Sequence, residues 1–259
     1  MAAAPVPPVP SSTNPLPPPV QEPLSQAARI VNTFIAPSKT FADLRRSASW
    51  WAPFLLVAIV STVFVYTVDQ KIGFRKVTEN QVQMSPKQSA QLDKLPADQR
   101  EKQMEQRTIG TKYVSYFFFV FPLIIWLIVG AVLYGTFKFA AGADVSYKVS
   151  LAIVVFAGLP GLLKTLLATL SVVAGMSPDS FSFQNPVATN PGYFMNPADN
   201  VFLYSVMTSI DIFLIWTLVL TAIGFTCVSK VKRGTAFAIV FGWWAVFSVA
   251  GAAFAAMVS

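Results

Sequence analysis

Five long apolar stretches dominate the sequence, and they limit the chain to folds built within a membrane. A helix needs roughly 20 apolar residues to cross about 30 Å of hydrocarbon. Only helices and closed barrels satisfy backbone groups in lipid, and these stretches are too long and too continuously apolar for barrel strands. We therefore expect an all-α, polytopic membrane protein, a five-transmembrane-helix bundle, with spans at about 50–68, 114–139, 149–175, 201–228 and 234–258.

The charge content agrees with this class of fold. Only 12% of the residues are charged, whereas a soluble domain carries about 25%. The formal net charge of +7 would indicate a nucleic-acid partner in a soluble protein. Here Lys and Arg gather in loops and beside the spans, where they set topology and meet anionic lipid head groups. We therefore expect the lipid bilayer as a partner and no nucleic acid.

The side chains available for chemistry are few. The chain has no histidine and one cysteine, Cys227. This excludes a Ser-His-Asp triad, a Cys-His pair and a His-ligated zinc. An aspartyl protease of the membrane interior needs two embedded aspartates, and the apolar stretches hold one. We expect no enzyme, no catalytic residue, no cofactor and no metal, and we expect Cys227 to pack as a small residue.

The N-terminal residues 1–23 contain nine prolines. Proline fixes φ and removes a backbone donor, so this segment is expected to be an extended, disordered tail. The tail is interpreted as a passive extension, with a ligand for a proline-reading domain as the alternative.

Residues 24–49 predict two short amphipathic helices that lie in the head-group plane. Pro37 ends the first helix, and Phe41 and Leu44 form the apolar side of the second. Aromatic belts and basic side chains mark the membrane surface. The expected interfacial anchors are Arg45, Arg46, Trp50 and Trp51.

Two loops of the membrane domain, 50–258, differ in character. Residues 69–113 form a polar loop, expected to be helical in part, with nine Lys/Arg and six Asp/Glu. Residues 176–200 contain neither Lys nor Arg and predict an irregular loop. The positive-inside rule favours a cytoplasmic N-terminus and an outside C-terminus in the cytoplasmic (inner, plasma) membrane, although the nine cations of 69–113 then lie outside.

Two ionisable residues, Lys164 and Asp211, lie deep in apolar stretches. Counted from Gly175 and Val201 at the same membrane face, both lie roughly 15 Å deep at about 1.5 Å per residue. Such residues are costly unless paired. We expect an ion pair between the third and fourth spans. It is interpreted as a structural bridge that fixes helix register, with a proton or ion relay, or no direct contact, as alternatives.

Helix breakers and small residues give weaker signals. Pro122 and Pro160 are expected to kink the second and third spans. A small-residue stripe in the last span favours close packing within the bundle or self-association. This stripe comprises Ala238, Gly242, Ala245, Ala252 and Ala256.

The stretch ARIVNTFIAPSKTFADLRRSASWWAPF at 28–54 resembles the start of the Yip-type membrane domain family, in its bacterial branch. The similar features are an amphipathic helix, Pro37-Ser38, a basic pair and paired tryptophans, with a Gly-Leu-Pro at 158–160. The resemblance implies a five-helix bundle and, in the eukaryotic branch, small prenylated GTPases as partners in vesicle traffic. The acidic Asp-Leu-Tyr-Gly-Pro motif of that branch is absent, so GTPase binding is doubtful here.

Two functions fit these features. The first is a non-enzymatic scaffold or membrane-organising, trafficking-type protein, whose partners would be other membrane proteins or a second copy of the chain. The alternative is a small transporter, or an ion or proton pathway, built around Lys164 and Asp211.

Overall fold

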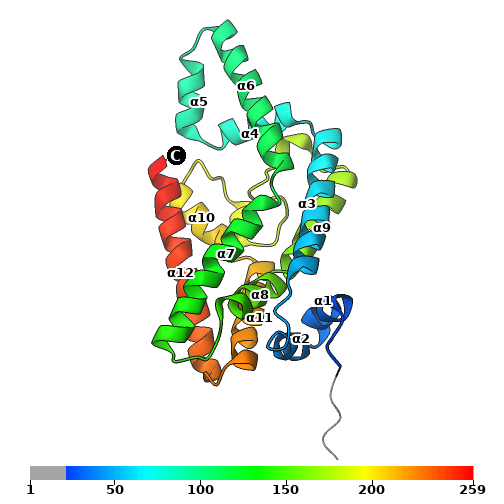
Figure 1. Ribbon diagram of the computed structural model, residues 1–259. Coiled ribbons are helices and arrows are strands. Elements are labelled where there is room, and N and C mark those ends of the chain that lie inside the picture. The colour runs from blue at the N-terminus through cyan, green and yellow to red at the C-terminus, as the bar shows by residue number, and fades with distance from the viewer. Residues whose placement is uncertain (1–21, 259) are drawn as a thin grey trace, which may run out of the picture.

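A computed structural model describes residues 22–258, and every regular element in this range is a helix (Figure 1). The expected tail, residues 1–23, lies almost wholly outside the described residues. The chain is a polytopic helical membrane protein, because several of its helices are long and apolar enough to cross a bilayer. Such spans use every backbone hydrogen bond internally, which is why these sequences are stable as helices in lipid.

Four spans are helical over their whole length or nearly so. They are α3 (Trp51–Lys71), α7 (Val120–Gly135) with the π-turn η1 (Thr136–Ala140), α8 (Tyr147–Ala157) with α9 (Pro160–Val173), and α12 (Arg233–Val258). Pro160 is the first residue of α9, so the third span breaks there, where a missing N–H costs least. Pro122 lies in the first turn of α7, after a non-helical stretch at 117–119 within the expected second span.

The fourth apolar stretch differs from the expected continuous helix. It forms α10 (Val201–Ser209) and α11 (Ile212–Val228), which are bent by 53° at the break. Asp211 occupies the break and caps α11 with its side chain. Hydropathy alone could not reveal this bend, because the two sides of Asp211 together are apolar enough for one span.

The 69–113 loop folds as a helical hairpin that projects beyond the spans (Figure 1). It consists of α4 (Phe74–Gln83), α5 (Pro86–Asp93) and α6 (Ala97–Tyr116). Arg75 of α4 binds both carboxylate oxygens of Glu101 of α6, at 2.7 and 2.9 Å. Asn80 donates to the carbonyls of Pro178 and Phe181, which joins the hairpin to the 176–200 loop. That loop, 176–200, is irregular, with only two short 3-10 turns, η2 (Pro178–Ser180) and η3 (Pro191–Phe194).

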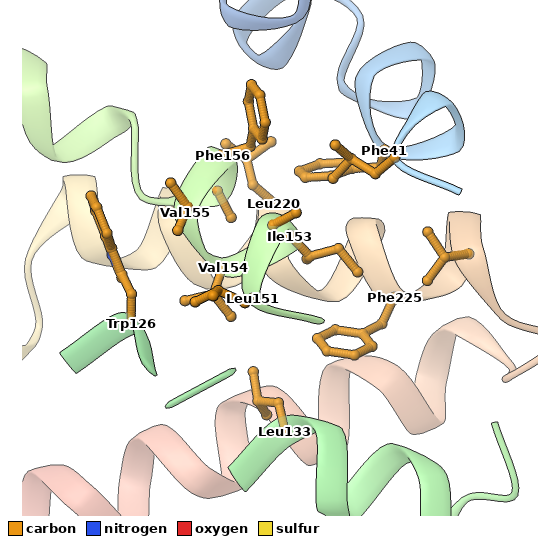
Figure 2. Close-up of a cluster of buried hydrophobic side chains, with 14 of the residues drawn as sticks. Phe41, Trp126, Leu133, Leu151, Ile153, Val154, Val155, Phe156, Leu220 and Phe225 are labelled. Carbon is orange, nitrogen blue, oxygen red and sulfur yellow. The ribbon is translucent and has the colours of Figure 1, made fainter. Parts of the chain in front are cut away.

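The main core surrounds α8, whose residues from Ser150 to Ala157 are all buried. Gly224 permits the close approach of α11, because a Cβ there would lie 2.5 Å from Ile153 Cγ2 and 3.1 Å from a Phe41 ring carbon. Figure 2 shows Phe41 reaching from α2 (Pro37–Asp43) toward the side chains of α8.

The second N-terminal helix is therefore not a surface helix with its apolar side in lipid. Phe41 and Leu44 are fully buried in the protein core. Its partner α1 (Gln26–Ile35) is held by a buried ion pair, in which Arg29 Nη2 lies 2.7 Å from Asp43 Oδ2. An amphipathic pattern fixes which side is apolar, but not whether lipid or protein covers that side. Of the two N-terminal helices, only α1 has large exposed apolar side chains, at Val31 and Ile35.

Candidate functional site

The candidate site is built around Asp211, at the break between α10 and α11. Its Oδ1 accepts hydrogen bonds from the backbone N–H groups of Phe213 and Leu214, at 2.9 and 3.3 Å. This is an ordinary helix N-cap, which satisfies two of the free donors of α11. Asp211 therefore begins a helix where the apolar sequence would otherwise continue one.

The second carboxylate oxygen binds the charge partner expected from the sequence. Lys164 Nζ on α9 donates to Asp211 Oδ2 at 2.8 Å. The Asp211 side chain is 4% exposed and that of Lys164 is 24% exposed. The expected ion pair between the third and fourth spans is thus present, with the carboxylate as its buried member.

The 176–200 loop supplies the remaining partners of this carboxylate. Thr189 Oγ1 donates to Asp211 Oδ2, and Asn190 Nδ2 lies 3.4 Å from the same oxygen. The carbonyl of Thr189 accepts from the backbone N–H of Ile212 at 3.1 Å. Asn190 in turn exchanges hydrogen bonds with Asn185, at 2.7 and 3.1 Å. The loop therefore enters the bundle and closes over the broken span.

The electrostatic consequence is that Asp211 is saturated. A carboxylate has about four lone-pair sites, and five donors surround this one. Charged groups in a low-dielectric interior need this degree of compensation. The site is suited to holding α9, α11 and the loop in a fixed arrangement.

A comparison of the chain with known protein families gives a match. The Yip1 domain matches residues 31–254. This chain belongs to the Yip1 domain family. The match begins within α1, ends near the end of α12 and includes every span and both members of the ion pair. Comparisons with curated proteins and with solved structures gave no match.

The other residues singled out from the sequence of this Yip1 domain protein lie apart from Asp211. Arg45 and Arg46 are exposed after α2. Trp51 is 59% exposed at the start of α3, where an interfacial anchor belongs. Trp50 is half-buried and packs edge-on against Phe54, with ring centroids 6.1 Å apart. Within residues 22–258, no group of three His, Cys, Asp or Glu side chains could hold a metal ion.

Sequence reasoning missed the loop partners of this Yip1 domain. Asn185, Thr189 and Asn190 lie in a segment that was expected only to be irregular. A usable signal was present, because both asparagines precede proline, in a loop without Lys or Arg. Asparagine before proline favours a fixed turn in which the amide can serve as a local partner.

Proposed function

We propose that this Yip1 domain protein is a non-enzymatic membrane scaffold that organises other membrane proteins, in a cell membrane with its N-terminus cytoplasmic and its C-terminus outside. Support for this orientation comes from the two ends of the bundle. One end carries α1, α2 and the short loops at 141–146 and 229–232 (Figure 1). Lys138, Lys148, Lys230, Lys232 and Arg233 lie at or beside those short loops. The opposite end carries the hairpin, whose charges are nearly balanced.

The observation that carries the proposal is the saturation of Asp211. A relay residue must exchange its proton with water or with another carrier. Here each carboxylate oxygen is occupied by fixed donors, two of them backbone N–H groups of α11. The apolar cavity between α7, α8, α11 and α12 is lined by neither Lys164 nor Asp211. These features support a structural bridge rather than a pathway.

Two rigid projections would serve as recruitment surfaces. At the cytoplasmic end, α2 is fixed to α11 by Phe41, so its exposed residue Lys39 is presented in a constant position. At the outer end, α6 and the residue after it carry exposed aromatic and aliphatic side chains near the expected membrane surface, at Tyr113, Val114 and Phe117. Both surfaces are held by packed helices and not by loops.

A transporter built on the ion pair is the second candidate, favoured by the partial exposure of Lys164. Proteoliposomes with an internal pH dye separate the two. A scaffold leaves proton flux at the level of empty vesicles under an imposed gradient. Flux above that level, lost in a folded Asp211→Asn variant, would overturn the proposal.

Recruitment is tested by photocrosslinking in cells. A photoreactive residue in place of Lys39 is expected to give a discrete protein adduct. The additional charge reversal Arg45→Glu should weaken this adduct. The matched control is Val63, which is exposed on α3 within the span and should label only lipid. Lipid adducts alone at both positions would contradict the scaffold at this surface.

A further inference from the structure

An apolar cavity of about 220 Å³ lies inside the membrane domain, apart from the ion pair. Its walls come from α7, α8, α11 and α12. The lining residues cover 125–133 on α7, 214–221 on α11 and 240–247 on α12. At about 1.5 Å per residue, each wall runs for roughly 10–12 Å along its helix. The cavity is therefore long and narrow, and it follows the direction of the spans.

The lining selects against polar and charged occupants. None of the residues that line it is charged. The hydroxyls of Thr217 and Thr221 donate to carbonyls within α11, at 3.0 and 2.8 Å, so their protons are not available to a ligand. Trp244 also lines the cavity, and its indole Nε1 is buried with no acceptor among the described residues. An ion or a strongly polar molecule would lose its hydration here, and a single indole N–H would not replace it.

Exposed lining residues on two helices place the cavity beside the surface of the bundle. α7 packs on α8, whereas α12 packs on α10 and α11, so α7 and α12 form two separate walls. Figure 2 shows Trp126 and Leu133 on the wall formed by α7. Two lining residues on these walls face outward, with Ile125 57% and Phe247 43% exposed. Trp243 Nε1 donates to Thr136 Oγ1 at 3.0 Å and joins the walls at the end nearer η1.

We propose that this cavity binds one acyl chain of a membrane lipid, which enters between α7 and α12 and lies along the spans. The molecule that meets this opening in a bilayer is a lipid tail, and its shape and lack of polarity match the lining. The bound chain covers apolar side chains that otherwise face a void.

One lining residue and one exposed residue outside the cavity allow a test with a matched control. Leu218→Phe enlarges a side chain that lines the cavity, whereas Leu166→Phe makes the same change on the outer face of α9. Native mass spectrometry counts the phospholipid retained by the detergent-washed protein. Wild type and Leu166→Phe should each retain one lipid, and filling the cavity should weaken binding on the order of tenfold. Equal retention in a folded Leu218→Phe variant would overturn the proposal.

Tryptophan fluorescence gives a second measurement that does not depend on the folding of Leu218→Phe. Phosphatidylcholine with dibrominated chains is titrated into the delipidated wild-type protein. The bound chain should produce a saturable component of quenching that Trp51→Phe leaves in place. Trp244→Phe should make this component smaller without removing it, because Trp126 and Trp243 also line the cavity. Quenching without a saturable component, or a component unchanged in Trp244→Phe, refutes the acyl-chain site.

Discussion

Asp211→Asn separates the helix-capping role of this side chain from its charge. Asparagine caps a helix about as well as aspartate, so the bonds to Phe213 and Leu214 should survive. The amide nitrogen that replaces Oδ2 cannot accept from Lys164 or Thr189. Breaking a buried pair costs about 3–5 kcal/mol. We expect the lower end, about 3 kcal/mol, because the Lys164 side chain is 24% exposed.

The assay is the apparent melting temperature of the purified protein in detergent. At roughly 2–4 °C per kcal/mol for a chain of this size, Asp211→Asn should lower it by roughly 6–12 °C. Adding Lys164→Met removes the charge left without a partner and should recover most of the loss. An unchanged melting temperature in Asp211→Asn, or a double variant as unstable as the single one, would refute the structural bridge.

Three further perturbations test other parts of the fold. Gly224→Leu should destabilise the protein by about 1–3 kcal/mol through overpacking, because a Cβ there already meets Ile153 at 2.5 Å. Thermal melting measures this change. Gly242→Leu is the control, because no heavy atom lies within 4 Å of its added Cβ. Arg29→Met leaves Asp43 buried without its cation, so limited proteolysis should cut near α1 faster, and Arg29→Met with Asp43→Leu should restore resistance. The hydrogen bond with Arg75 lowers the pKa of Glu101. The stabilisation of the hairpin by this pair should therefore be present above about pH 4.3, the usual pKa of glutamate, and be lost as the pH falls through the lower pKa of Glu101 in the folded protein. Hydrogen exchange in α6 should report this change in wild type and not in Glu101→Gln.

The spans were predictable because lipid imposes one simple requirement, a long apolar helix. The ion pair was predictable for a similar reason, since equal depth in the bilayer brings Lys164 to the level of Asp211. The break at Asp211 was not, because the flanking residues are apolar whether the helix continues or restarts. The burial of Phe41 was missed because periodicity does not distinguish lipid from a protein neighbour.

The loop partners were missed for a different reason. Thr189 and Asn190 act through contacts with residues about 20 positions away, and loop composition does not encode such contacts. Arg29 and Asp43 are similar, since each looks like a solvated surface charge until α1 folds back on α2. In both cases a polar side chain is buried by an element that the local sequence does not identify.

The break between α10 and α11 bears on how this chain is made. The backbone N–H of Ile212 finds its acceptor in Thr189, outside the fourth span, and the Asp211 carboxylate needs Lys164 from the third. When the ribosome and insertase release this segment, its backbone N–H and its carboxylate still lack these partners. The third helix must already stand in the bilayer, and the segment before residue 200 must fold inward. For this part of the chain, insertion into lipid and tertiary folding are a single event.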